Sequence, residues 1–233
     1  MKKALVFGLL GAVASVITLS LAGALLWLLV PREQGLSLPA PLVSRNSDQG
    51  RRWEAAALRA DLSALDVHFE AQLLNSWCGV ASAVSVLGAR GIITSQPGFF
   101  TEPVREVKPV WQTTLMGMTL VELDGMLASY GLATTRKHAS SSSAEEFRSA
   151  LMNNMDDPDN WLMINYDRRV LGQEGAGHIS PVGAWLPSED QVLILDVSTY
   201  KYPAHWVPVE LLYRAMSGVD SDSELTRGWV EAR

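Results

Sequence analysis

The pattern of hydrophobic and polar positions divides the chain into three stretches. After Met1, Lys2 and Lys3, residues 4–30 form a run of 27 residues without a charged side chain. Residues 31–50 hold three prolines and no regular spacing of apolar positions, which is typical of a linker. In residues 51–233, apolar positions recur at helix and strand spacings. This last stretch, residues 51–233, is therefore predicted to be the globular domain.

The uncharged run at the N-terminus predicts a membrane segment. As a helix it would be about 40 Å long, enough to cross a bilayer, and it exceeds the roughly 7–15 apolar residues of a signal peptide. We therefore predict an uncleaved transmembrane anchor in residues 1–30. The small residues Ala22, Gly23 and Ala24 leave a cleaved signal peptide, and hence a secreted protein, as the alternative. Lys2 and Lys3 before the run favour an extracytoplasmic, periplasmic domain.

Within the predicted domain, helical patterns come first and strand patterns follow. A mostly apolar helix is predicted at residues 78–89, and two capping-box patterns predict helices at 119–131 and 143–155. A short helix is predicted at 207–216, with Pro208 in its first turn. Strands are predicted at 161–167, 178–185, 191–197 and 227–231. This segregation favours an α+β fold over alternating βαβ units.

Charge and cysteine content exclude several classes of protein. The chain has 19 Lys and Arg against 25 Asp and Glu, a net charge of −6, so we expect no nucleic-acid partner. Its one cysteine, Cys78, excludes a disulfide within the chain and a zinc site built from two of its own thiolates. Four histidines show no recognisable ligand spacing with Cys78, so we predict no metal site.

Three residues form a candidate set for nucleophilic catalysis. A lone cysteine is more often a buried small side chain, but Cys78 is predicted to begin a helix, where backbone N–H groups favour a thiolate. His178 lies next to glycine, and Asp196 ends an apolar strand pattern. If residues 178–185 and 191–197 pair as a hairpin, Asp196 lies beside His178. Cys78 would then have both a base and a group that orients the base.

Three segments of the chain resemble phytochelatin synthases. Residues 69–82 (FEAQLLNSWCGVAS) resemble the segment that holds the nucleophile in that family. Residues 177–183 (GHISPVG) resemble its histidine segment, and residues 195–208 (LDVSTYKYPAHWVP) its aspartate segment. The resemblance covers residues 66–230 and is closest in kind to the short bacterial members. It implies a papain-like fold, in which a helix carrying the cysteine packs on an antiparallel sheet carrying His and Asp.

The resemblance also implies roles for three further residues. Gln72 would supply the oxyanion hole together with the backbone N–H of Cys78. Asp220 and Arg227 would bind the γ-glutamyl head of the substrate, with Asp220 holding the ammonium group and Arg227 the carboxylate. Without the resemblance, both would be assigned to surface charge in a polar turn.

The activity that the resemblance implies is that of a glutathione γ-glutamylcysteinyltransferase. The cysteine would take the γ-glutamylcysteinyl group from glutathione, release glycine, and pass the group to water or to a second glutathione, which gives phytochelatin for metal detoxification. No cofactor is required, and cadmium or zinc would enter as thiolate complexes of glutathione. Two alternatives are a papain-like peptidase of the leader-peptide type and a non-catalytic thiol- or metal-binding module.

Overall fold

The computed structural model describes residues 20, 23 and 29–233. The predicted anchor in residues 1–30 lies almost entirely outside these residues, so the anchor and the cleaved signal peptide both stay predictions. Among the described residues, no helix combines the length and the apolar character needed to span a bilayer.

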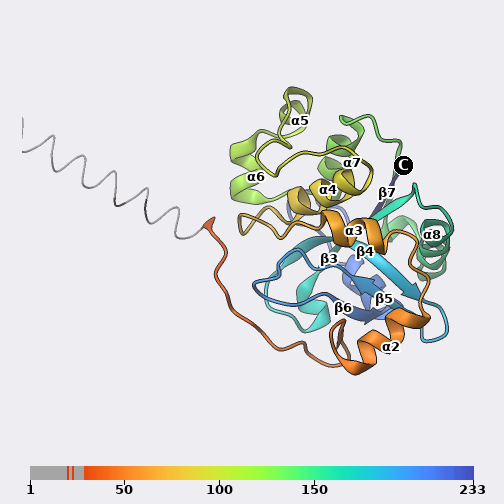
Figure 1. Ribbon diagram of the computed structural model, residues 1–233. Coiled ribbons are helices and arrows are strands. Elements are labelled where there is room, and N and C mark those ends of the chain that lie inside the picture. The colour runs from red at the N-terminus through yellow and green to blue at the C-terminus, as the bar shows by residue number, and fades with distance from the viewer. Residues whose placement is uncertain (1–19, 21–22, 24–28) are drawn as a thin grey trace, which may run out of the picture.

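A seven-stranded antiparallel sheet organises the described part of the chain (Figure 1). This sheet, with helices around it, confirms the predicted mixture of helices and antiparallel strands. In spatial order the strands are β1 (Val43–Ser44), β6 (His205–Pro208), β5 (Gln191–Ile194), β4 (Gly177–Leu186), β3 (Trp161–Asp167), β7 (Gly228–Ala232) and β2 (Thr134–His138).

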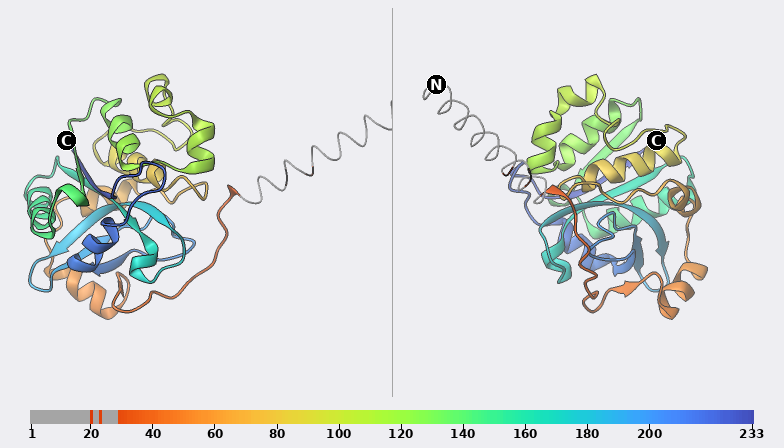
Figure 2. Two further views of the ribbon diagram at one scale, coloured as in Figure 1. Left: turned by 180° about the vertical axis from the view of Figure 1, so that it is seen from behind. Right: turned by 60° about the vertical axis from the view of Figure 1, so that its left-hand side comes forward.

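Helices cover both faces of the sheet (Figure 2). One face carries α3 (Leu62–His68), α4 (Cys78–Ala89) and α7 (Leu120–Ala128), and the other carries α8 (Ala144–Asp156) and α9 (Val209–Met216). Strand β3 shows why both faces need cover, because all seven of its residues are buried. Met163 packs in the hydrophobic cluster on the α4 side, and its neighbours Leu162 and Ile164 pack in the cluster on the α8 side.

Both predicted capping boxes mark the start of a helix. The Thr119 hydroxyl accepts a hydrogen bond from the backbone N–H of Glu122, whose carboxylate accepts one from the N–H of Thr119. Ser143 caps α8 through the N–H of Glu146. Pro208 departs from its prediction, because it ends β6 instead of lying in a helix, and α9 begins at the next residue.

The segment predicted as a linker packs on the domain. The backbone N–H groups of Gln34 and Gly35 both donate to the carbonyl of Tyr200. Farther on, β1 pairs with β6, and α2 (Asp48–Ala56) follows it. Residue 51, the predicted start of the domain, therefore falls inside α2.

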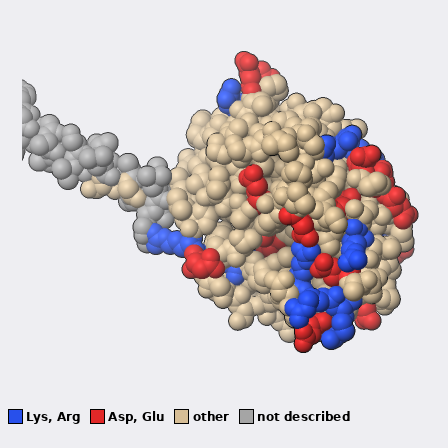
Figure 3. All heavy atoms as spheres, viewed as in Figure 1, with Lys and Arg blue, Asp and Glu red and all other residues tan. Residues whose placement is uncertain are grey.

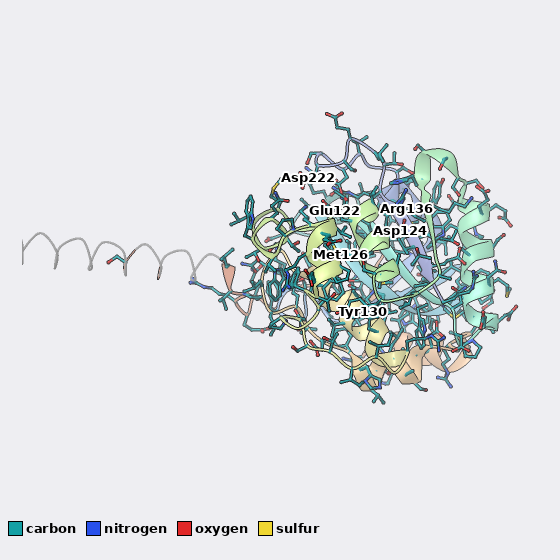
Figure 4. The ribbon with its side chains drawn as sticks, turned by 90° about the horizontal axis from the view of Figure 1, so that it is seen from above. Glu122, Asp124, Met126, Tyr130, Arg136 and Asp222 are labelled. Atoms are coloured by element: carbon teal, nitrogen blue, oxygen red, sulfur yellow. The ribbon has the colours of Figure 1, made fainter. Side chains whose placement is uncertain are left out.

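Two small helices, α5 (Glu102–Val107) and α6 (Val110–Met116), lie beyond α7 (Figure 1). The segment between them is tied to α7, because Lys108 Nζ lies 3.0 Å from Glu122 Oε2. Helix α7 is linked to β2 in turn, since Arg136 donates a hydrogen bond to Asp124 over 2.6 Å (Figure 4).

The charged side chains on the face shown in Figure 3 are of both signs. Lys and Arg lie among Asp and Glu, so this face is neither uniformly basic nor uniformly acidic.

Candidate active site

Cys78 is the first residue of α4 and is half-buried. It lines a pocket of about 300 Å³ together with His178, Asp220 and Arg227. The next residue, Gly79, leaves room for the side chain of Met118 beside Cys78. A Cβ at residue 79 would lie 2.4 Å from the sulfur of Met118. The absence of a side chain at residue 79 lets Met118 pack closely behind the start of the helix.

The β4–β5 hairpin brings His178 and Asp196 together, as expected if the two predicted strands pair. His178 is the second residue of β4, and Asp196 follows the end of β5 by two residues. The Nε2 atom of His178 lies 3.0 Å from Asp196 Oδ1, and both side chains are buried. The Ser180 hydroxyl lies at the same distance from Nε2. Because Nε2 is engaged on that side, Nδ1 is the ring nitrogen left to accept a proton.

Burial and the buried cation Arg168 both shift the pKa values of Cys78 and His178. Burial lowers the pKa of His178 to about 4, and the positive charge of Arg168 acts in the same direction. Burial also raises the pKa of the Cys78 thiol, against the effect of Arg168 and of backbone N–H groups. These effects oppose one another at the sulfur, so the expectation of a thiolate at the helix start stays a prediction.

Gln72 is buried in the loop before α4, and its side chain is fully engaged there. Its amide nitrogen donates to the carbonyls of Leu74 and Asn75, both at 2.9 Å, and its Oε1 accepts from the Ser198 hydroxyl at 2.7 Å. The amide thus holds the shape of the loop that leads to Cys78. Its predicted role in an oxyanion hole stays a prediction.

Asp220 and Arg227 are brought together at the pocket, and their role in binding a head group stays a prediction. Arg227 Nη1 donates to Asp220 Oδ2 at 3.0 Å and to Asn165 Oδ1 at 3.2 Å. Among the described residues, Arg227 Nε has no hydrogen-bond partner although it is buried. The pocket lining therefore includes a carboxylate and a guanidinium that are paired with each other.

Two residues near the site escaped the sequence analysis. Arg168 begins the short helix η2 (Arg168–Leu171) and contacts Asp196, and Asn165 of β3 supports Arg227. Neither stands near a predicted site residue in the sequence, and only the sheet brings them there. Among the described residues, no group of three or more His, Cys, Asp or Glu side chains has the geometry of a metal site.

The chain is similar in sequence to one protein family. The family model for phytochelatin synthase matches residues 33–229. Glutathione gamma-glutamylcysteinyltransferase 2 of Arabidopsis thaliana is 32% identical over 216 residues, which cover 83% of this chain and 45% of that protein. The Schizosaccharomyces pombe enzyme of the same name is 39% identical over 114 residues, which cover 49% of this chain and 28% of the yeast protein. The chain therefore spans less than half the length of these relatives.

One solved structure is similar at a lower level. The peptidase domain of Streptococcus ComA, a bi-functional ABC transporter involved in a quorum sensing pathway, has a TM-score of 0.45 and 17% sequence identity. The similarity covers 70% of this chain and 95% of that domain.

Proposed function

Because this chain belongs to the phytochelatin synthase family, we propose that it is a thiol acyltransferase that removes glycine from glutathione. The γ-glutamylcysteinyl group passes through a thioester on Cys78 to water, which gives γ-glutamylcysteine, or to a second glutathione, which gives phytochelatin. Curated relatives named glutathione gamma-glutamylcysteinyltransferase support this activity.

The observation that carries the proposal is the composition of one pocket. Its lining includes a nucleophile and base, Cys78 and His178, and an oppositely charged pair, Asp220 and Arg227. The γ-glutamyl head of glutathione carries an ammonium and a carboxylate on one carbon, and such a pair can recognise both groups. Binding the head there would present the carbonyl between the cysteinyl and glycyl residues to the sulfur.

The first half-reaction follows from the neighbouring nucleophile and base. His178 Nδ1 takes the thiol proton as Cys78 Sγ bonds to the carbonyl carbon. Asp196 on Nε2 stabilises the imidazolium that forms. The imidazolium then gives its proton to the nitrogen of glycine as the C–N bond breaks, which leaves the thioester and free glycine.

The second half-reaction reverses the proton transfers with a new acceptor. His178 takes a proton from water or from the amino group of a second glutathione, which attacks the thioester carbonyl and releases the Cys78 thiol. Cadmium or zinc enters this scheme as a thiolate complex of glutathione, that is, as part of the substrate. No step of the scheme requires a cofactor.

The oxyanion of both tetrahedral intermediates needs hydrogen-bond donors. The backbone N–H of Cys78 is one donor in this proposal, and the amide of Gln72 is the second. For Gln72 to act, its Nε2 must turn from the carbonyls of Leu74 and Asn75 toward the pocket. Substrate binding would have to drive that exchange of partners.

The proposal extends to the fold family and to location. A helix with a cysteine at its start, packed on an antiparallel sheet that holds His178 and Asp196, supports a papain-like arrangement.

The uncharged residues 4–30 support a membrane anchor, and Lys2 and Lys3 before them support an extracytoplasmic catalytic domain. Protease protection of the full chain in vesicles tests that orientation.

Mass spectrometry of glutathione incubated with the full chain tests the activity, with and without cadmium. We expect free glycine and γ-glutamylcysteine, and phytochelatin where a second glutathione acts as acceptor. The variant Cys78→Ala should yield none of these products. Glutathione left intact by the wild-type chain under both conditions would refute the substrate assignment and direct the search to peptide substrates.

Substitution of Gly177 by alanine should weaken glutathione binding without disturbing the chemistry. A Cβ at residue 177 would lie 2.6 Å from Arg227 Nη1 and 2.9 Å from its Cζ. The guanidinium must then leave Asp220 and Asn165, since a side-chain end moves more easily than a strand. We expect KM for glutathione to rise about 10-fold, the cost of roughly one hydrogen bond to a charged group, while kcat changes little.

Gly218→Ala is the matched control for Gly177→Ala. A Cβ at residue 218 would meet its nearest atoms at 3.7 Å, which is ordinary contact. Its KM should equal that of the wild-type chain. An unchanged KM in Gly177→Ala would argue against head-group binding at Arg227.

A further inference from the structure

A buried arginine holds the carboxylate that faces the base. Arg168 is only 3% exposed, and its Nη2 lies 2.7 Å from Asp196 Oδ1 and 2.9 Å from Oδ2. The same Oδ1 lies 3.0 Å from His178 Nε2. Asp196 is thus clamped between a permanent cation and the imidazole, and its position depends on both.

A second set of contacts fixes the arginine itself. Its Nη1 donates to Gln173 Oε1 at 2.8 Å, and the Gln173 amide nitrogen lies 3.1 Å from His205 Nε2. The other ring nitrogen of His205 lies 2.8 Å from the carbonyl of Pro203 and donates to it. Since Nε2 of His205 accepts from the amide, that imidazole is neutral. The ring of Tyr202 lies 5.4 Å from the guanidinium carbon and closes one side.

We propose that Arg168 is a positioning residue for the acyl transfer, which holds the Asp196 carboxylate against His178. Its effect on rate rests on the proposed function. Its effect on the imidazole does not, because the contacts exist without substrate.

The charge of Arg168 affects the pKa of His178 more than the other cations near the imidazole do. The titratable and charged groups around the imidazole come from every neighbouring element. They are Asp196 after β5, Arg168 in η2, Cys78 in α4, His205 in β6, Tyr166 in β3, and Tyr200 and Lys201 in the loop after Asp196. Beyond burial, Arg168 is the main group that lowers the pKa of His178, and Asp196 opposes it. Removal of the cation therefore leaves Asp196 free to favour imidazolium.

Two variants separate the charge of Arg168 from its shape. Arg168→Gln removes the charge, and Arg168→Lys keeps the charge but cannot pair with both carboxylate oxygens. Ring resonances of His178 in the full chain, assigned with His178→Asn, report its titration without substrate. Glycine release from glutathione across pH reports the same ionisation as the acid limb of kcat/KM.

We expect the His178 titration and the acid limb to move to higher pH by about one unit or more in Arg168→Gln. In Arg168→Lys both should stay near the wild-type values, while kcat falls about 10-fold through looser positioning. The neighbouring arginine supplies the control, since Arg169 pairs with Asp167 and its side chain is 67% exposed. Arg169→Gln should change neither measurement.

The possible outcomes are distinct. A wild-type chain that releases no glycine refutes the proposed function, and the resonance titration still decides the role of Arg168. An Arg168→Gln chain that is folded and shows the wild-type His178 titration overturns the inference. If Arg168→Gln does not fold, a wild-type kcat together with a wild-type titration in Arg168→Lys overturns the positioning role.

Discussion

Replacement of Cys78 by serine should slow glycine release from glutathione by about 10,000-fold or more, in keeping with the loss of other catalytic nucleophiles. The hydroxyl is close in size to the thiol, so the start of α4 and its contact with Met118 persist. A hydroxyl is far harder to deprotonate than a thiol, and His178 is a weak base because burial lowers its pKa to about 4. The rate of glycine release in a stopped assay checks this prediction.

Alkylation supplies an independent check on the same atom. Cys78 is the one cysteine of the chain, so a single iodoacetamide adduct reports on it alone. Burial raises the thiol pKa, which lowers the thiolate fraction at a given pH. The alkylation rate should therefore rise with a midpoint above the ordinary thiol value of about 8.5. In the glycine-release assay, a Cys78→Ser chain with a rate within 10-fold of the wild-type rate would contradict the assignment of Cys78 as the nucleophile.

The positions of the three central residues could be predicted from the sequence because each follows from a local pattern. The helix that starts at Cys78 is mostly apolar, and the strand patterns that carry His178 and lead to Asp196 are close enough in the sequence to pair as a hairpin. Strand pairing then determines which residues are neighbours. Pairing of β4 with β5 brings the Asp196 carboxylate to 3.0 Å from His178 Nε2.

Arg168 could not be predicted in the same way. It follows Asp167 and precedes Arg169, so the sequence around it resembles an exposed strand end with mixed charges. Its partner Asp196 lies 28 residues away, and the contact forms only in the folded chain. Local periodicity contains no information on such a contact.

Strands β1, β2 and β6 were not predicted, and β2 and β6 were missed for a related reason. Strand β2 contains Arg136 and Lys137 and is only partly buried, so its pattern lacks a clear apolar face. Strand β6 ends at Pro208, whose ring suggests a helix start, although its pairing with β5 makes it part of the sheet. In both cases the neighbouring strand supplies the hydrogen bonds, and the sequence of the strand alone does not reveal it.

Replacement of Asp196 by asparagine should lower the free energy of unfolding by about 3–5 kcal/mol. The carboxylate is fully buried and is the counter-charge for Arg168, whose side chain is 3% exposed. An amide leaves the guanidinium buried without a negative partner, and loss of one member of a buried ion pair costs about that much. Urea denaturation followed by tryptophan fluorescence measures the change. A loss below about 1 kcal/mol would contradict the assignment.

Removal of both charges separates the pair from its parts. In Arg168→Gln with Asp196→Asn, neither charge is left unpaired, so the double variant should be more stable than the Asp196→Asn chain. Asp159→Asn breaks an exposed pair with Arg90 and serves as the control. Its cost should stay below about 1 kcal/mol.

The cost of Asp196→Asn should also depend on pH with a definite sign. Burial raises the pKa of Asp196, but Arg168 and His178 outweigh burial and hold it well below its usual range. A carboxyl with a lowered pKa in the folded state stabilises the fold above its unfolded value of about 4, and this contribution is lost as pH falls toward the folded value. The difference between the wild-type chain and Asp196→Asn should therefore be full at pH 7 and shrink below pH 4. A difference that grows in acid would mean that the carboxylate is not held by the cation.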